Sequence, residues 1–327
     1  MTVHLHICTF SISEICRIFC ILAVHFHTLI CVICGNLFCI HLQISKSPNL
    51  QINMPSSQTN LAFLNDHLVP LDDPSLLSVN SDLVIYEVIR VMDGKCLFLE
   101  DHLNRLFNSA ALAGRILNMS RSGLSLSLYK LLSANSLILG NIRLEIRFQK
   151  NEFQLIILII PHHYPSTDDY KTGVKAISFK AERGNPNAKI LNPGLRTRIN
   201  ELIREADAEE AVLVNSQGYV TEGSRSNLFF IKENTILTSP YDTVLVGITR
   251  DKVFDLCREM SFNIVERNIN FSGINQFDSA FITGTSPRIL PLNCIDNIPF
   301  ETDNELMQKL MLAYNERIRQ YLDKASA

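Results

Sequence analysis

Residues 219–227 of this 327-residue chain have the sequence YVTEGSRSN. They follow a turn at residues 216–218 and precede an apolar strand candidate at residues 228–231. A Glu followed by Gly and Ser is, by itself, typical of a turn, so Glu222 indicates a functional site only if other segments support it. The segments that do so are HLNR at 102–105, NAKILN at 187–192, GITR at 247–250 and TGTS at 283–286.

The GITR and TGTS segments have the chemistry of an anion site. Gly247 precedes a predicted helix whose first N–H groups can hold a phosphate, and Thr249 adds a hydroxyl. Residues 284–286 end a predicted strand with small side chains that let the backbone approach an anion. Arg105 can add a bidentate contact. A GxxxxGK[ST] loop is missing, so nucleotide binding of that type is not supported.

Lys189 becomes a candidate functional residue only in combination with these segments. A Lys just before a helix is usually a solvated surface residue. A phosphate site, a Lys and the carboxylate of Glu222 in one half of the chain instead suggest a phosphorylated cofactor that forms an imine.

These segments resemble the class IV aminotransferases, the fold-type IV family of pyridoxal-phosphate enzymes. The family includes branched-chain aminotransferases, D-amino acid aminotransferases and aminodeoxychorismate lyases. The resemblance covers roughly residues 61–295 and is strongest at YVTEGSRSN (219–227), LVGITR (245–250) and FITGT (281–285). Such an ordered set is far more specific than any single motif.

The resemblance implies an α+β fold with two domains and assigns the site residues one by one. Lys189 is implied to be the catalytic residue, which holds pyridoxal 5'-phosphate as a Schiff base, and Glu222 is implied to pair with the pyridine nitrogen. The residues implied to bind the phosphate are Arg105, Ile248, Thr249 and Thr285. Tyr86 matches an aromatic position that faces the substrate, and Arg143 resembles the arginine that branched-chain enzymes use near the substrate carboxylate.

The chain also departs from the family pattern. Lys189 is followed by Asn-Pro-Gly at residues 192–194, where many relatives carry a bulkier residue, and Val246 stands where proline is common. No Arg-x-His carboxylate trap of the D-amino acid enzymes follows Arg143. These departures leave the substrate and its stereochemistry open.

Apolar patterning organises the rest of the chain. Residues 83–91 predict a strand, Asp93-Gly94 a hairpin turn, residues 96–99 the return strand, and a helix starts at about Asp101. The polar stretch at 161–171 predicts a domain junction. We expect a small N-terminal α/β domain at 54–165 and a larger cofactor-binding domain at 166–327.

The first 53 residues do not match this pattern. Residues 18–40 are long and apolar enough to span a bilayer. A second interpretation is a metal site, from Cys31-x-x-Cys34 with His25-x-His27 nearby, but one CxxC without a second properly spaced ligand pair is weak. The favoured interpretation is an extension outside the folded protein, with the functional start at Met54. A cytoplasmic enzyme is then expected, with membrane anchoring through residues 18–40 as the alternative.

The predicted function is therefore amino-group transfer between an amino acid and a 2-oxo acid, with a branched-chain amino acid as one candidate. One alternative is a lyase of the same cofactor class that acts on aminodeoxychorismate, motivated in part by Asn192. A distant alternative is a non-catalytic, membrane-tethered binding protein. The net charge of −3 gives no bias toward nucleic acid. No metal is expected, and the family resemblance implies a homodimer.

Overall fold

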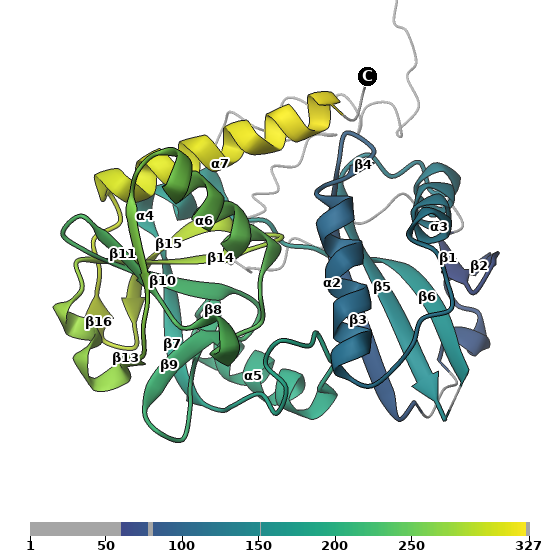
Figure 1. Cartoon of the computed structure of the whole chain (residues 1–327), viewed down its shortest axis with the longest axis horizontal. Coiled ribbons are helices and arrows are strands. Elements are labelled where there is room, and N and C mark those ends of the chain that lie inside the picture. The colour runs from purple at the N-terminus through teal and green to yellow at the C-terminus, as the bar shows by residue number, and fades with distance from the viewer. Residues whose placement is uncertain (1–59, 78–80, 151, 325–327) are drawn as a thin grey trace, which may run out of the picture. The chain divides into compact units, whose positions relative to one another are not determined.

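The computed structural model describes residues 60–77, 81–150 and 152–324, which form two β-sheets with associated helices (Figure 1). Within these ranges no helix combines the length and the apolar character needed to cross a bilayer. No cluster of three or more His, Cys, Asp or Glu side chains suited to a metal ion occurs in the same ranges. The membrane-anchor and CxxC interpretations fall on residues 18–40, which lie outside the described part of the chain.

The first sheet is antiparallel throughout, with the strand order β2-β1-β6-β5-β3-β4. Its strands are β1 (Leu61–Leu64), β2 (His67–Pro70), β3 (Leu83–Met92), β4 (Lys95–Cys96), β5 (Gly140–Gln149) and β6 (Glu152–Ile160). A short 3-10 helix, η1 (Pro74–Leu76), follows β2. The central β3–β5 ladder pairs Leu83 with Phe148 at one end and Val91 with Gly140 at the other.

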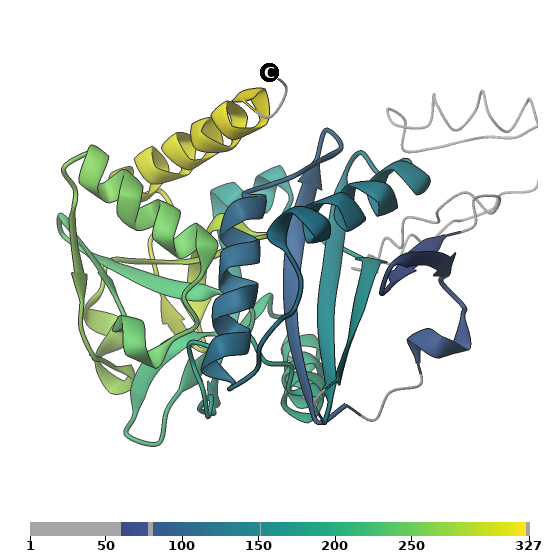
Figure 2. The same cartoon turned by 45° about the vertical axis from the view of Figure 1, so that its right-hand side comes forward.

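Two helices, α2 (Leu99–Leu112) and α3 (Arg121–Ala134), supply the leucines that pack on one face of this sheet. Because side chains alternate along a strand, Ile85 and Ile89 of β3 join this core while Tyr86 lies on the opposite face. Figures 1 and 2 show α2 on the side of the sheet nearer the rest of the molecule. The ion pair between Asp101 Oδ2 and Lys252 Nζ, 2.8 Å, ties α2 to that part.

The hairpin after β3 differs in one respect from the sequence prediction. Asp93 and Gly94 form the expected turn, both with positive φ (51° and 71°). The return strand, however, ends at Cys96, and the prediction of a strand at 96–99 was wrong. Phe98 adopts a left-handed conformation (φ 52°) that breaks the strand, and α2 begins at Leu99, earlier than predicted.

The second sheet has the order β12-β11-β10-β14-β15-β7-β8-β9-β13, with β16 paired to β15. Its strands are β7 (Val174–Lys180), β8 (Glu210–Val214), β9 (Tyr219–Gly223), β10 (Asn227–Lys232), β11 (Thr235–Thr238), β12 (Asn263–Glu266), β13 (Ile269–Asn270), β14 (Ser279–Gly284), β15 (Arg288–Ile295) and β16 (Ile298–Pro299). The associated helices are α4 (Thr167–Thr172), α5 (Pro193–Glu205), η2 (Tyr241–Thr243), α6 (Ile248–Glu259), η3 (Phe271–Gln276) and α7 (Glu305–Lys324).

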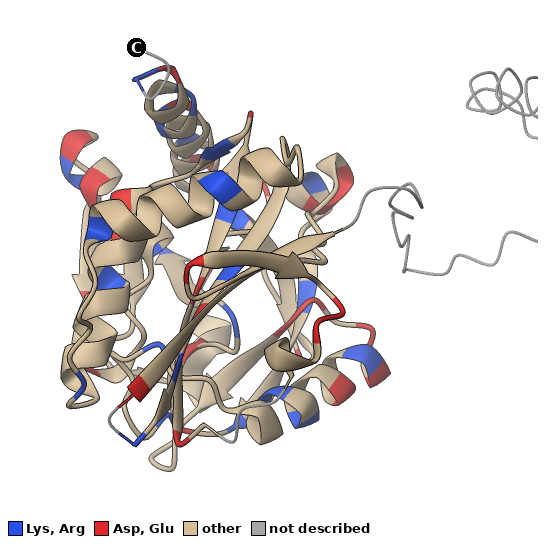
Figure 3. Ribbon diagram, turned by 90° about the vertical axis from the view of Figure 1, so that its right-hand side faces the viewer, with Lys and Arg blue, Asp and Glu red and all other residues tan. Residues whose placement is uncertain are grey.

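Alternation again sorts the side chains of this sheet. Phe229 and Phe281 stack at 4.9 Å between ring centroids on the face covered by α6 and α7. Phe230 lies on the other face and stacks on Phe277, which follows η3. Figure 3 shows basic and acidic residues on several of the helices, whereas α3 carries basic but no acidic residues. The cores of both layers consist mainly of apolar side chains, and the buried polar groups described next are exceptions.

Candidate active site

Lys189 lies in the loop between β7 and α5, and backbone hydrogen bonds hold that loop against the edge of β3. Tyr86 N donates to Lys189 O (3.1 Å), and Leu191 N donates to Val84 O (2.9 Å). Lys189 N in turn donates to Ser109 Oγ on α2 (3.1 Å). The loop thus adds a short strand-like segment to the first sheet, which fixes where the lysine side chain starts.

The Lys189 amine lies over an aromatic ring and has a perturbed pKa. Its Nζ is 4.7 Å from the centroid of the Tyr86 ring. Burial lowers the pKa of Lys189; the Tyr86 hydroxyl opposes this effect and the Arg105 guanidinium adds to it. A lowered pKa increases the fraction of neutral amine, which is the nucleophilic form.

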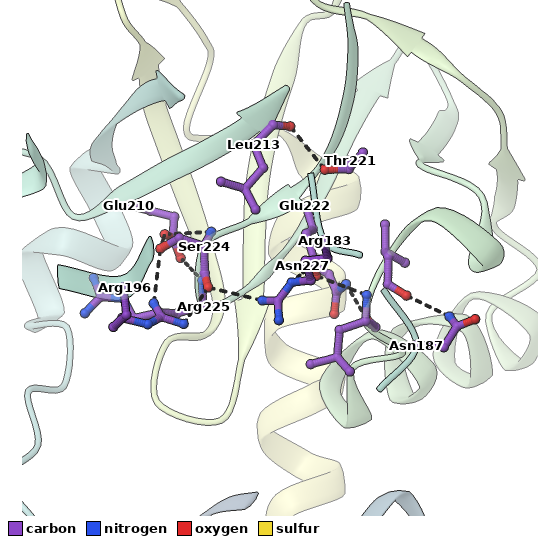
Figure 4. Close-up of polar contacts among 12 residues, drawn as sticks. Arg183, Asn187, Arg196, Glu210, Leu213, Thr221, Glu222, Ser224, Arg225 and Asn227 are labelled. Carbon is purple, nitrogen blue, oxygen red and sulfur yellow. Dashed lines mark hydrogen bonds and ion pairs between the residues drawn. The ribbon is translucent and has the colours of Figure 1, made fainter. Parts of the chain in front are cut away.

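Glu222 is a buried carboxylate on β9 with two partners. Its Oε1 lies 2.6 Å from Arg183 Nε, and its Oε2 accepts from Leu245 N at 3.1 Å (Figure 4). Burial raises the pKa of Glu222, while the Arg183 guanidinium acts against that rise. Arg183 was not predicted from the sequence as a site residue, although it lies six residues before Lys189 in the same loop.

Arg105 lies on α2 and shares its guanidinium between β3 and the segment before α6. Its Nε and one terminal nitrogen donate to the two oxygens of Glu87 (2.8 and 2.6 Å), and the other donates to Val246 O (3.1 Å). His102 Nδ1 also contacts Glu87, at 2.8 Å. Burial would raise the pKa of Glu87, but Arg105 and His102 outweigh it and lower that pKa to about 2.

The N-terminus of α6 fits an anion. Gly247 is the N-cap and no side chain caps the helix. The first helical bond runs from Asp251 N to Gly247 O, so the preceding N–H groups, including those of Ile248 and Thr249, point out of the helix end. A Cβ on Gly247 would lie 2.0 Å from Asn227 Oδ1, so only glycine leaves the backbone this close.

Thr285 lies between β14 and β15, in a loop tied to the first sheet. Its Oγ1 donates to Val88 O at 3.4 Å. The neighbouring Ser286 accepts from Arg90 through its carbonyl (3.1 Å) and from Asn141 Nδ2 through its hydroxyl (2.9 Å). These bonds hold the TGTS segment beside β3 and β5.

Tyr86 and Arg143 lie on neighbouring strands and on the same face of the first sheet. The Arg143 guanidinium carbon is 5.4 Å from the centroid of the Tyr86 ring. Arg143 Nε lies 2.6 Å from Glu145 Oε1, and Arg147 binds the other oxygen of Glu145. The Glu145 carboxylate therefore balances part of the positive charge of Arg143, which was predicted to bind substrate. Glu145 was not predicted as a site residue.

One cavity of about 430 Å³ brings all of the sequence-predicted site residues together. Its lining includes Tyr86, Arg105, Arg143, Lys189, Glu222, Ile248, Thr249 and Thr285. The volume falls in the range of roughly 300–1,000 Å³ typical of small-molecule sites. This cavity contains an amine, a buried carboxylate and an uncapped helix end. These groups suit the aldehyde, the ring nitrogen and the phosphate of pyridoxal phosphate, respectively.

Comparisons with known proteins support this match. The family model described as amino-transferase class IV matches residues 84–295. A D-alanine aminotransferase from Bacillus licheniformis is 33% identical over 224 residues, which cover 65% of this chain and 78% of that protein.

Solved structures share the fold. A branched-chain amino acid aminotransferase from Escherichia coli aligns with a TM-score of 0.71 at 21% identity and covers 79% of this chain and 94% of its own. A Legionella pneumophila protein described as a 4-amino-4-deoxychorismate lyase aligns with a TM-score of 0.65 at 24% identity, over 75% of this chain and 94% of its own. Other matching structures contain pyridoxamine 5'-phosphate or N-(5'-phosphopyridoxyl)-L-glutamate. The chain belongs to the class IV aminotransferases, and it is an enzyme that uses pyridoxal 5'-phosphate for amino-group transfer.

Proposed function

We propose that this enzyme moves an amino group between an amino acid and a 2-oxo acid, with Lys189 as the catalytic residue. The observation that carries the proposal is the convergence of Lys189, Glu222 and the uncapped end of α6 on one cavity. Neither amino-group donor nor acceptor follows from the fold, because relatives of several substrate classes share it.

Lys189 has two tasks in this proposal. Its Nζ would hold the cofactor covalently. When bound, pyridoxal phosphate supplies a ring that accepts the electron pair released from the substrate α-carbon. The neutral Nζ of Lys189 would act as a base that takes up the α-proton of the substrate and holds it for return to the product. The lowered pKa of Lys189 favours the neutral amine that this step requires.

Glu222 and the anion site hold the cofactor at its two other ends. The Glu222 carboxylate would keep a proton on the ring nitrogen, and the Arg183 contact favours the charged form of Glu222. Four residues would hold the phosphate: Arg105, Ile248, Thr249 and Thr285. The main-chain N–H groups at the start of α6 contribute there without a cost in side-chain entropy.

We propose donors with small or branched apolar side chains. Val88, Ile160 and Leu191 line the same cavity and offer apolar surface. Arg143 is proposed to act near the substrate carboxylate, from its place beside Tyr86. The D-alanine aminotransferase that is 33% identical supports alanine as a donor, and the branched-chain enzyme of the same fold supports valine, leucine and isoleucine.

The test uses the purified full chain with added pyridoxal phosphate. We expect borohydride to fix the cofactor on the peptide that contains Lys189, and we expect turnover with at least one donor in a panel of L- and D-amino acids with 2-oxoglutarate and pyruvate. Lys189→Ala serves as the control and should abolish both signals. Full activity of Lys189→Ala, or no fixed cofactor in the wild type, would overturn the proposal.

A lyase acting on aminodeoxychorismate is the second candidate, because a protein described as such a lyase shares the fold. The sequence argument from Asn192 has a structural explanation instead, since its Oδ1 accepts from Leu195 N and caps α5. Pyruvate release from aminodeoxychorismate without an oxo-acid acceptor would favour the lyase.

We also propose that the enzyme is a homodimer, as the family resemblance implies. Light scattering on the full chain tests this, and a monomer mass would refute it. The membrane-tethered alternative depends on residues 18–40, outside the described residues. A non-catalytic role is at odds with membership of the aminotransferase family.

A further inference from the structure

Arg196 is a cavity residue that the sequence analysis did not predict. It lies in the second turn of α5 and lines the 430 Å³ cavity together with Lys189 and Glu222. It also lines an adjoining cavity of about 250 Å³. Tyr86 and Ser224 line both cavities too, so Arg196 lies where the two meet.

The guanidinium of Arg196 is held in place by uncharged groups. One terminal nitrogen donates to Ser224 O (2.9 Å) and the other to Ser224 Oγ (3.4 Å), as Figure 4 shows. Tyr86 lines both cavities with Arg196, and the Arg196 guanidinium helps to lower the pKa of the Tyr86 hydroxyl. Ser224 is itself fixed, because its Oγ donates to Glu210 Oε1 at 2.6 Å. The guanidinium is therefore positioned before any ligand arrives.

The charge balance distinguishes Arg196 from three other arginines of the cavity. Those three each contact a carboxylate within 2.6 Å: Arg105 with Glu87, Arg143 with Glu145, and Arg183 with Glu222. For Arg196, the hydrogen-bond partner of the side chain found among the described residues is the neutral Ser224, and no carboxylate of the described chain forms an ion pair with it.

The carboxylate that fixes Ser224, that of Glu210, already accepts several hydrogen bonds. Glu210 accepts hydrogen bonds from Ala211 N, from Ser224 and Ser226 and from Arg225 N. Arg225 also lines the cavity and has no carboxylate of the described residues within 4.0 Å, but it is exposed and donates to Glu209 O.

Tyr86 connects Arg196 to the reacting centre. Lys189 Nζ lies 4.7 Å from the centroid of the Tyr86 ring, and the positive charge of Arg196 acts on the Tyr86 hydroxyl. The positive charge of Lys189, aided by Arg196 and Arg183 against the effect of burial, lowers the pKa of Tyr86 to about 8. An anion bound here would have the Tyr86 hydroxyl and the Arg196 guanidinium as partners.

We propose that Arg196, together with the Tyr86 hydroxyl, binds a carboxylate of the substrate. The inference rests on the proposed aminotransferase function and names a recognition residue for it, separate from Arg143. A carboxylate there gains charge-assisted hydrogen bonds in a partly desolvated place, and it balances a charge that no protein carboxylate balances in the described chain.

The first test measures binding without turnover. Propionate and propionamide have nearly the same shape and differ in charge, and each is titrated calorimetrically into the cofactor-loaded full chain. We expect propionate to bind at least tenfold more tightly than propionamide in the wild type, and this preference to vanish in Arg196→Gln. Equal affinity of the wild type for the two probes would overturn the proposal, whatever the variants do.

The second test compares variants in the half-reaction with an amino donor, followed by the change in cofactor absorbance. Arg196→Gln should raise the KM by roughly 10- to 100-fold and Arg196→Lys by less, because lysine keeps the charge without the bidentate fork. The matched control is Arg198→Gln, two residues along α5, where the exposed guanidinium lies 5.4 Å from the Phe179 ring and lines neither cavity. An unchanged KM in Arg196→Gln would refute the role.

The panel of amino donors shows whether Arg196 binds the α-carboxylate or a side-chain carboxylate of the substrate. If Arg196 holds the α-carboxylate, the KM rises for alanine and glutamate alike; if it holds a side-chain carboxylate, it rises for glutamate and aspartate alone. Wild-type protein that converts no donor would refute the proposed function. Wild-type turnover with no effect at Arg196 would refute this inference alone.

Discussion

Arg183 Nε lies 2.6 Å from Oε1 of Glu222, so the loop that carries Lys189 is also bonded to the carboxylate proposed for the ring nitrogen. The two site residues come from different elements, a loop and β9, and Arg183 joins them directly. Burial raises the pKa of Glu222, and this guanidinium is the first of the groups that act against the rise.

Replacing Arg183 with Gln should therefore move the pH profile. Without the guanidinium, the pKa of Glu222 rises further, so more of the carboxyl is protonated at neutral pH. Since the charged form is the useful one, the acid limb of kcat/KM should shift to higher pH. Rate measurements from pH 5 to 9 check this, and an acid limb at the wild-type position would contradict it.

The same variant should also lose stability. Breaking a buried ion pair by removing one partner costs about 3–5 kcal/mol, because the other charge stays buried. A Glu with a raised pKa in the folded state destabilises that state as the pH rises through its pKa. The loss in Arg183→Gln should thus be largest at neutral pH and shrink as the solution is acidified, which urea unfolding of the cofactor-free protein would show.

Glu87 predicts the opposite pH dependence. Its pKa is about 2 in the folded protein, compared with an ordinary value of 4.5, because Arg105 and His102 outweigh burial. The stability it contributes is complete above pH 4.5 and is lost as the pH falls toward 2. Glu87→Gln should flatten the acid-unfolding curve in this window and cost about 3–5 kcal/mol at neutral pH.

A matched control for this variant is Glu305→Gln. Glu305 is exposed and pairs with Lys309 one helical turn away, so its loss should change the unfolding free energy little. A Glu87→Gln protein that unfolds like the control would show that the buried Glu87–Arg105 pair does not stabilise the fold.

Much of the first sheet could be predicted from sequence because its signal is local. The strand at 83–91 and its turn depend on neighbours in the chain, and the predicted strand and turn are confirmed. The β2 strand was missed because its four residues are largely exposed and end in Pro70, so they carry little apolar alternation. The α4 helix was missed despite a local signal, the capping box between Ser166 and Asp169.

The polar partners of the site could not be predicted in the same way. Glu87 follows Tyr86 directly, but alternation sends it to the opposite face, where it meets Arg105 eighteen residues later in the sequence. Glu222 meets Arg183 across 39 residues, and that distance includes a helix and a strand (222 − 183 = 39). No spacing rule links such residues, since only the packed sheet brings them together.

Gly247 offers a test of the anion site by shape alone. In Gly247→Ala, the new methyl group would lie 2.0 Å from Asn227 Oδ1 and displace an amide that donates to Leu245 O at 2.8 Å. We expect overpacking to cost about 1–3 kcal/mol of stability and to weaken cofactor binding about tenfold. Fluorescence titration with pyridoxal phosphate measures the second effect.

Gly194→Ala is the control for that experiment, because a Cβ there meets no atom within 4 Å. Alanine also favours the helix, so this variant should bind the cofactor normally and be as stable as the wild type or slightly more so. Equal cofactor affinity in the two glycine variants would show that the end of α6 does not bind the phosphate as proposed.

We expect Lys189 to lower the stability of the cofactor-free protein. Burial lowers its pKa, with further lowering by Arg105 and Arg183, so its charged form destabilises the folded state below the ordinary lysine pKa of 10.5. Lys189→Met keeps the chain length and removes the charge. We expect it to lose aminotransfer completely and to gain about 1 kcal/mol of stability at pH 7.

The gain should shrink as the pH approaches 10.5, because the wild-type lysine then loses its proton in the unfolded state as well. Thermal unfolding at pH 7 and pH 10 measures it, with the exposed Lys130→Met as the control. A Lys189→Met protein that is less stable than the wild type at pH 7 would mean that the amine contributes more through its contacts with Tyr86 than it costs through burial.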